Sequence, residues 1–206
     1  MIIKRTANAG VMIELDGVTF LFDGVAEELA PYMGTPHHIR ESLTKNPPDV
    51  VAFTHLHKDH YDKSYAEEYM KRTLRPVYGP ECLPPQSTRN IKIKTVANRH
   101  IGKTEISHIS YIIYGSKCVW IMGDASPLDW KNADEFPKPD VVIVPYAYAI
   151  TASAWRITKS LDAKDIVLVH LPPRECDEHG LWNLAKQNIC GDTSVHIPEI
   201  GQVIEI

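Results

Sequence analysis

Apolar and polar residues alternate along residues 10–22, on either side of Asp16-Gly17. This dipeptide is favoured where a two-residue hairpin turn requires positive φ angles, so the pattern predicts that the chain begins with antiparallel strands. Residues 49–54 (DVVAFT) are almost continuously apolar, which is typical of a strand buried on both faces. Further strand-like runs follow at residues 91–96, 106–114, 118–122, 141–145 and 166–170.

Helix signals lie between these runs. A helix is expected from Thr35-Pro36 to Leu43, because threonine can cap it and proline is tolerated in the first turn. Asp62 can cap a second helix, which Arg75-Pro76 ends. Two later helices are predicted over residues 151–161 and 181–189. Strands in hairpins, followed by strands alternating with helices, indicate an α/β arrangement in layers with helices outside the sheets.

Length and charge limit the functional classes. At 206 residues, with 44% hydrophobic and 23% charged residues, the chain is expected to fold as a single domain over residues 1–206. A net charge of -4 gives no overall positive field for nucleic acid. The densest basic stretch, residues 89–103, alternates lysines with apolar residues and is interpreted as the solvated face of a strand. Nucleic acid is therefore not favoured as a partner.

Nothing in the sequence favours a membrane. The longest weakly polar stretch, residues 141–155, is shorter than the roughly 18 residues needed to cross a bilayer and contains Pro145. The first residues lack the apolar block of a secretory signal. Cysteines at positions 82, 118, 176 and 190 form no CxxC motif, so reduced thiols and a cytoplasmic location are expected. A homo-oligomer is left open.

A dense cluster of metal-ligand side chains follows the buried strand. His55, His57, Asp59 and His60 occupy six consecutive positions (HLHKDH). Residues two apart in an extended segment point the same way, so His55 and His57 can bind one cation together. Asp59 and His60 can reach a second cation, and two cations about 3.5 to 4 Å apart can share and activate one hydroxide. The cluster therefore predicts a metal site.

The string HLHKDHYD resembles the HxHxDH signature of the metallo-β-lactamase superfamily of metal-dependent hydrolases. The resemblance extends over essentially the whole chain: NAGVMIELDGVTFLFDG is similar to the first hairpin of that family. Gly123-Asp124 resembles its metal-bridging aspartate, and His170, at the end of IVLVH, matches its last ligand. The resemblance implies an αββα sandwich of two mixed β-sheets, with helices on the outer faces and metals at the sheet edges.

Two metal subsites follow from this resemblance. The first would contain His55, His57 and a third histidine, and Asp124 would bridge to the second. The second subsite would contain Asp59, His60 and His170. Both His100 and His108 can supply the third histidine. The family usually places this ligand a few residues before the returning strand, which favours His100. His108 would then be structural or would donate a proton to the leaving group.

Other residues near these motifs keep two interpretations. Asp23 ends FLFD as the family's ligand-orienting aspartate does, or it is a turn residue. Tyr146 and Tyr148 line the substrate pocket or pack in the core. The remaining histidines are expected to have surface or capping roles; they are His37, His38, His179 and His196.

The expected activity is hydrolysis by a metal-bridging hydroxide. It would attack a carbonyl or phosphoryl centre of a small molecule (a lactone, ester, thioester or phosphodiester), with Asp59 and Asp124 as the catalytic carboxylates. The chain is most similar to the lactonase-like branch of the superfamily. Two divalent metal ions are implied. Zn²⁺ is expected first, with Mn²⁺ or Fe²⁺ as alternatives, because imidazole and carboxylate ligands suit all three.

Other functions remain as alternatives. The chain could be a non-catalytic metal-binding or regulatory domain, or a nuclease of the ribonuclease Z type, although no substrate-binding arm is visible. Neither a glycine-rich nucleotide loop (GxGxxG or GxxxxGK[ST]) nor the GxSxG motif of a serine nucleophile is present, so neither chemistry is supported.

Overall fold

The computed structural model describes residues 1–102, 105–131, 133–189 and 191–206. Its first sheet has the order β13-β1-β2-β3-β4-β5. Strands β13 to β3 pair antiparallel, and β3, β4 and β5 pair parallel, so the sheet is mixed. The strand bounds are β13 (Val203–Glu205), β1 (Ile2–Arg5), β2 (Val11–Leu15), β3 (Val18–Phe22), β4 (Val50–Ala52) and β5 (Val77–Tyr78).

The second sheet has the order β12-β11-β10-β9-β8-β7-β6. Strands β12 to β9 pair parallel, and β9 to β6 pair antiparallel, so this sheet is mixed as well. The bounds are β12 (Val195–His196), β11 (Asp165–Val169), β10 (Val141–Pro145), β9 (Cys118–Ile121), β8 (His108–Tyr114), β7 (Ile91–Asn98) and β6 (Ser87–Thr88).

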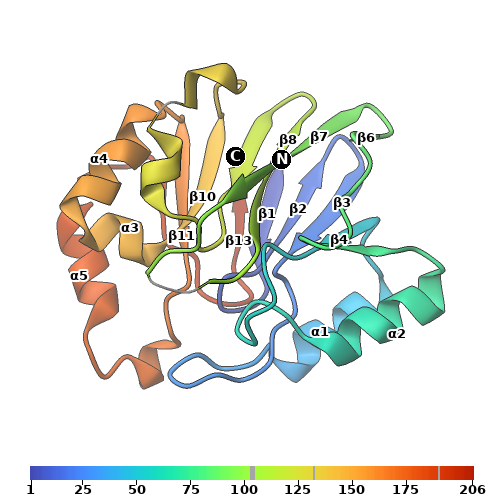
Figure 1. Cartoon of the computed structure of the whole chain (residues 1–206). Coiled ribbons are helices and arrows are strands. Elements are labelled where there is room, and N and C mark those ends of the chain that lie inside the picture. Colours follow the sequence, from blue (N-terminus) through green and yellow to red (C-terminus); the bar gives the residue numbers. More distant parts are fainter. Residues whose placement is uncertain (103–104, 132, 190) are drawn as a thin grey trace.

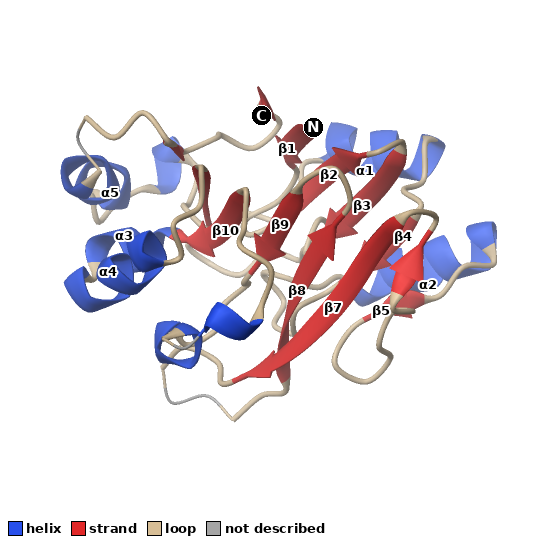
Figure 2. Cartoon of the chain, turned by 90° about the horizontal axis from the view of Figure 1, so that it is seen from above, coloured by secondary structure: helices blue, strands red, loops and turns tan. Residues whose placement is uncertain are grey.

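Helices cover the outer face of each sheet (Figures 1 and 2). Helices α1 (His37–Lys45) and α2 (Lys63–Thr73) lie on the first sheet. Helices α3 (Tyr146–Ile150), α4 (Ala152–Ser160) and α5 (Leu181–Asn188) lie on the side of the second. Short 3₁₀ helices occur at Pro127–Trp130, Ala133–Glu135 and Arg174–Cys176. This confirms the expected αββα sandwich.

Three hydrophobic layers hold the sandwich together. The central layer lies between the sheets, where the rings of Phe22 from β3 and Tyr111 from β8 are 5.0 Å apart. An outer layer packs Leu21 and Val51 against α1 and α2, and another packs β9, β10 and β11 against the other helices. Strand β4 is buried throughout, as its near-continuous apolar run predicted. Strands β3 and β8 to β11 also contribute to two layers, so their residues are almost all buried.

The predicted helix start at Asp62 is confirmed, because its carboxylate accepts a hydrogen bond from the backbone N–H of Tyr65. The predicted cap at Thr35 was wrong. The Thr35 hydroxyl accepts from the backbone N–H of Ala26 instead, and α1 begins after Pro36 without a side-chain cap. Helix α3 was not predicted, because its sequence YAYAI continues the apolar run of β10 without a helical period.

Strand β8 begins at His108 rather than at residue 106, because its partner β7 ends at Asn98, which pairs with His108. Along β7, Lys92 and Lys94 are exposed while Ile91 and Ile93 are buried, which confirms a solvated strand face. Lys103, at the end of the basic stretch, and Cys190 lie outside the described residues. Cys82, Cys118 and Cys176 carry free thiols. In the part of the chain that the structure describes, no helix has the length and apolarity needed to cross a bilayer.

Candidate metal centre

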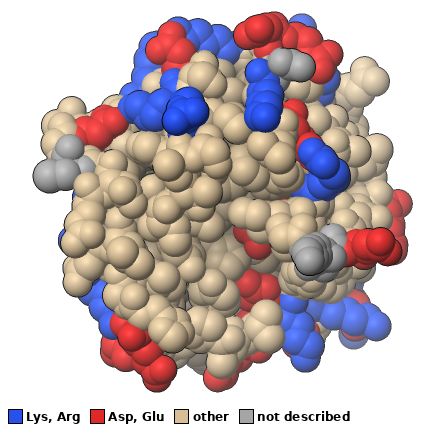
Figure 3. Space-filling model, turned by 60° about the vertical axis from the view of Figure 1, so that its left-hand side comes forward, with Lys and Arg blue, Asp and Glu red and all other residues tan. Residues whose placement is uncertain are grey.

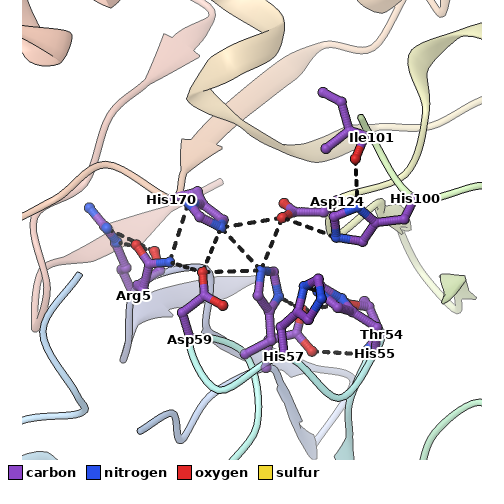
Figure 4. Close-up of polar contacts among 12 residues, drawn as sticks. Arg5, Thr54, His55, His57, Asp59, His100, Ile101, Asp124 and His170 are labelled. Atoms are coloured by element: carbon purple, nitrogen blue, oxygen red, sulfur yellow. Dashed lines mark hydrogen bonds and ion pairs between the residues drawn. The ribbon is translucent and has the colours of Figure 1, made fainter. Parts of the chain in front are cut away.

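The predicted ligands meet at one edge of the sandwich. The segment containing His55, His57, Asp59 and His60 follows β4, Asp124 follows β9, and His170 follows β11. Carboxyl ends of parallel strands share one edge of a sheet, and this edge is where open α/β folds bind ligands. His100 reaches the same place from the connection between β7 and β8, where it pairs with Ala125 in an isolated bridge. Figure 4 shows the labelled side chains among them converging, namely His55, His57, Asp59, His100, Asp124 and His170.

The donor atoms fall into three groups, and within each group the atoms lie within 4.8 Å of one another. Asp124 Oδ2 is 3.4 Å from the Nε2 atoms of both His60 and His170, and 3.7 Å from His100 Nε2. It therefore lies between the two predicted subsites. The groups are His55, His57 and His100; His55, His60 and Asp124; and Asp59, His60 and His170.

This donor set fits divalent cations. It consists of imidazole nitrogens and carboxylate oxygens, which Zn²⁺, Mn²⁺ and Fe²⁺ all accept. His100 donates from Nδ1 to the carbonyl of Ile101 (2.6 Å), and its Nε2 is buried without a hydrogen-bond partner among the described residues. A buried polar atom without a partner carries a free-energy cost, which a cation would remove. The structure thus assembles the seven predicted residues, and their ligation of metal stays a prediction.

His108 lies beside the groups but belongs to none of them. It is 3% exposed, its ring centre is 5.1 Å from that of His55, and neither ring nitrogen has a described hydrogen-bond partner. Burial lowers the pKa of His108 to about 3, although the charge of Asp124 opposes the change. The ring is therefore neutral at neutral pH. His100 therefore belongs to a donor group, whereas His108 lies beside the groups without belonging to one.

Asp23 orients one of the predicted ligands. Its buried Oδ2 accepts a hydrogen bond from His60 Nδ1 (2.9 Å), which turns His60 Nε2 toward the centre. The carboxylate is fixed in turn, because it accepts from both the backbone N–H and the hydroxyl of Thr54, each at 2.7 Å. Of the two interpretations of Asp23, the structure supports the orienting role.

Gly123 is required for the placement of Asp124. Its φ is +54°, and a Cβ atom there would lie 2.5 Å from the Thr54 hydroxyl oxygen. Only glycine adopts such a conformation without steric cost while another side chain packs this closely. The Gly-Asp pair thus lets the chain turn toward the centre directly after β9.

The pKa shifts at the centre keep its carboxylates negatively charged. His55 stays neutral, because burial lowers its pKa far below the ordinary value. Burial would also lower the pKa of His170, but Asp124 and Asp59 raise it to about 9. Burial would raise the pKa of Asp124, yet His170 and His60 hold it well below the usual range. The carboxylates are thus ionised at neutral pH and attract cations.

Two residues at the centre were not predicted as site residues from the sequence, although Asn8 begins the hairpin string that resembles the family. The side-chain nitrogen of Asn8, in the loop between β1 and β2, is 3.3 Å from Asp59 Oδ2 and 3.3 Å from His170 Nδ1. The ring of Tyr32 packs edge-on against His170, with ring centres 4.6 Å apart. Neither contact has a local sequence signal, because each joins segments that are distant in the chain.

The remaining sequence candidates have other surroundings. Tyr148 is buried and donates to the carbonyl of Ala125, so it packs in the core. Tyr146 is half-buried and neighbours Tyr32. His196 binds Asp165 (2.7 Å). Exposed histidines with no described role at the centre are His37, His38 and His179.

A cavity of ≈ 470 Å³ adjoins the centre at Tyr32. Its apolar lining includes Pro31, Met33 and Leu181, and no lysine or arginine is among the described lining residues. Its charged lining is acidic and consists of Glu28, Glu175, Asp177 and Glu178. This lining favours neutral or cationic groups over anions.

A comparison with protein families identifies the family, and solved structures share the fold. A family model described as the β-lactamase superfamily domain matches residues 3–170. A possible metal-dependent hydrolase from Veillonella parvula superposes with a TM-score of 0.74 at 15% identity, covering 100% of this chain and 99% of that one. An isothiocyanate hydrolase from Delia radicum gut bacteria gives 0.69 at 18% identity, with 100% and 99% covered.

Igni18, a metallo hydrolase from Ignicoccus hospitalis, gives a TM-score of 0.66 at 18% identity, covering 98% of this chain and 97% of that one. At these identities the three likenesses show the shared fold. No curated protein sequence matches the chain significantly.

Proposed function

Since this chain belongs to the metallo-β-lactamase superfamily of metal-dependent hydrolases, we propose that it hydrolyses a small, uncharged or cationic organic molecule at a two-cation centre. The position of Asp124 carries this proposal. Its Oδ2 lies within 3.7 Å of His100 on one side and within 3.4 Å of His60 and His170 on the other. A carboxylate placed in this way suits two neighbouring cations.

The main role of the side chains at the centre would be to bind the two cations. His55, His57 and His100 would hold one cation and Asp59, His60 and His170 the other, with Asp124 shared. When bound, two divalent cations act as Lewis acids and make water nucleophilic at neutral pH. The metals proposed are Zn²⁺ first and Mn²⁺ or Fe²⁺ as alternatives.

Tyr32 would contact the substrate. It lines the acidic cavity and touches His170, so a molecule in the cavity meets this phenol next to the cations. Burial, and after it the neighbouring Tyr146, raises the pKa of Tyr32, so its hydroxyl keeps its proton and can donate a hydrogen bond to a substrate oxygen or sulfur.

The charges around the centre support an uncharged or cationic substrate. Carboxylates line the cavity beside Tyr32, and in the face shown in Figure 3 lysine and arginine lie mainly toward the rim. A lactone, ester or thioester fits this surface better than a phosphodiester does, because an anion would be repelled. The structural relative that hydrolyses isothiocyanates adds a further uncharged electrophile to the substrates worth testing.

The test combines metal analysis with a substrate panel. Protein loaded with Zn²⁺ or Mn²⁺ is expected to bind two cations and to hydrolyse members of an uncharged panel of lactones, thioesters and isothiocyanates faster than a phosphodiester. Asp124→Asn should weaken both cation sites and lower kcat/KM by orders of magnitude while the fold survives.

Asp162→Asn is the matched control, because Asp162 is exposed and pairs with Lys138 on the surface. It should keep both the metal and the activity. A protein that binds two cations and turns over nothing would instead support a non-catalytic metal-binding domain, and full activity in Asp124→Asn would exclude the shared role of Asp124.

A further inference from the structure

The two ring nitrogens of His170 face different surroundings. Nε2 points into the centre, 3.2 Å from Asp59 Oδ2 and 3.1 Å from His60 Nε2. Nδ1 points away from it and lies 3.3 Å from the side-chain nitrogen of Asn8. The backbone of His170 has a φ of +70°, and its N–H donates to the carbonyl of Asn8 (2.9 Å). His170 is thus held from behind by this one residue.

Asn8 is itself held firmly. It is 2% exposed, and Arg5 donates from Nη2 to its backbone carbonyl (2.8 Å) and to that of Leu171 (2.5 Å). Figure 4 shows Arg5 next to His170 and Asp59. The Asn8 side-chain oxygen, Oδ1, is buried and has no hydrogen-bond partner among the described residues. A buried acceptor without a partner is costly, so this atom calls for an explanation.

Metal binding by His170 supplies the explanation. A neutral imidazole carries its hydrogen on one nitrogen and its free lone pair on the other. If Nε2 binds a cation, Nδ1 carries the hydrogen and needs an acceptor. The amide nitrogen of Asn8 cannot accept a hydrogen bond, whereas Oδ1 can, and the two ends of an amide exchange by a half-turn of the side chain.

Asp59 explains why the residue is an amide. The side-chain nitrogen of Asn8, which faces His170 Nδ1, also lies 3.3 Å from Asp59 Oδ2. In this position an amide nitrogen can donate a hydrogen bond to the carboxylate, whereas an amide oxygen can accept one from the imidazole N–H. A cation bound by Asp59 offsets the carboxylate charge, which makes the oxygen acceptable there.

We propose that Asn8 is a positioning residue of the Asp59–His60–His170 subsite, whose Oδ1 accepts the Nδ1 hydrogen of His170 when Nε2 binds a divalent cation. The inference rests on the proposed two-cation function. Asn8 holds Nδ1 of His170 in the same way that Asp23 holds Nδ1 of His60, and Nδ1 is the nitrogen that faces away from the metal.

The first experiment locates the His170 hydrogen. Nitrogen-15 NMR of the Zn²⁺-loaded protein distinguishes the two imidazole tautomers. We expect the hydrogen on Nδ1 of His170 in the unchanged protein, with the shift of a hydrogen-bonded imidazole. In Asn8→Leu the same hydrogen should lose this signature. A Zn²⁺-loaded His170 with its hydrogen on Nε2 would overturn the inference.

The second experiment measures the affinity for the second Zn²⁺ equivalent by chelator competition. Asn8→Leu, which has the same size but no polar atom, should bind it roughly 10 to 100 times more weakly. Asn8→Asp keeps an acceptor for His170. Its charge would repel Asp59 in the metal-free protein, and a bound cation would offset that repulsion, so this variant should bind the second Zn²⁺ at least as tightly as the unchanged protein. Thr6→Val is the matched control, because it removes a buried hydroxyl without a described partner from the same loop, and it should change nothing.

The outcomes separate the two proposals. An unchanged protein that binds fewer than two Zn²⁺ ions would refute the proposed function, and the role of Asn8 with it. Two bound ions together with undiminished affinity in Asn8→Leu would refute the role of Asn8 alone. If Asn8→Leu does not fold, the role of Asn8 is decided by two other measurements, namely the tautomer of His170 in the unchanged protein and the Zn²⁺ affinity of Asn8→Asp.

Discussion

At the scale of single residues, three histidines of the centre are each held through Nδ1. His55 Nδ1 lies 3.0 Å from the Thr54 hydroxyl, His60 Nδ1 binds Asp23, and His100 Nδ1 binds a backbone carbonyl. In each of these histidines Nε2 remains available to bind a cation. The centre is therefore shaped before any cation arrives, which reduces the ordering that binding requires.

The first prediction concerns the third histidine of the first subsite. Because His100 is grouped with His55 and His57, His100→Ala should lose about one equivalent of bound metal per protein. His108→Ala should keep both equivalents, since His108 lies in no donor group. The measurement is metal content after gel filtration in metal-free buffer. Loss of metal from His108→Ala alone would reverse the assignment.

Part of this site is readable from the sequence, because His55, His57, Asp59 and His60 are neighbours in the chain. The choice between His100 and His108 is harder, since the antiparallel register places both ends of the β7–β8 connection at the same edge. Asn8 begins the hairpin string that resembles the family, but nothing in that string indicates a role at the centre. It is 51 positions from Asp59 and 162 from His170, and only the folded chain brings them together.

At the scale of elements, the turn after β9 is the most constrained feature. Gly123→Ala should cost about 1 kcal/mol or more for its positive φ, plus about 1 to 3 kcal/mol for the contact with Thr54. Gly180→Ala is the matched control, because its φ is +66° and nothing lies within 4 Å of the added Cβ. Its cost should be limited to the backbone term.

Denaturant unfolding of the metal-free proteins measures this difference without interference from cation binding. Equal free energies of unfolding for Gly123→Ala and Gly180→Ala would show that the space beside Thr54 is not restrictive. The comparison separates two effects that the sequence motif Gly-Asp combines, namely the backbone conformation and the close approach to the neighbouring strand end.

Elements with their own signals were predicted, and those defined by distant partners were not. Helix α2 carries a capping aspartate, and β2 and β3 surround an Asp-Gly turn. Strands β1, β5 and β13 have only two to four residues, which is too short for an alternating pattern, and they were not predicted. The equally short β4 and β9 were predicted because each lies within a longer apolar run. Thr35 failed as a cap because a loop segment nine residues away uses its hydroxyl.

At the scale of the whole molecule, the centre joins the two sheets. His55, His57, Asp59 and His60 extend from the first sheet, whereas Asp124 and His170 extend from the second. Cations bound between them would link the halves of the sandwich. Metal binding should therefore contribute to the free energy of unfolding, because a cation that binds only the folded chain stabilises it.

The last prediction is the pH dependence of this stabilisation. In the metal-free protein, burial lowers the pKa of His170 but Asp124 and Asp59 raise it to about 9, above its value of about 6.5 in an unfolded chain. The pKa of His60 is also raised, by Asp124 and Asp23 against the effect of burial. A histidine with a raised pKa stabilises the fold fully below the unfolded value and loses this contribution as pH rises through the folded value.

The metal-free protein should therefore lose thermal stability between about pH 6.5 and 9, as His170 loses its proton and leaves carboxylates unbalanced. Zn²⁺ replaces that proton, so the increase in Tm on adding stoichiometric Zn²⁺ should grow over the same range. Thermal unfolding with chelator or Zn²⁺ at pH 6.5, 7.5 and 9 measures both trends. His170→Asn, which tolerates the positive φ, should show a weaker loss without metal. A metal-free protein whose Tm rises toward pH 9 would contradict the charge balance assigned to this centre.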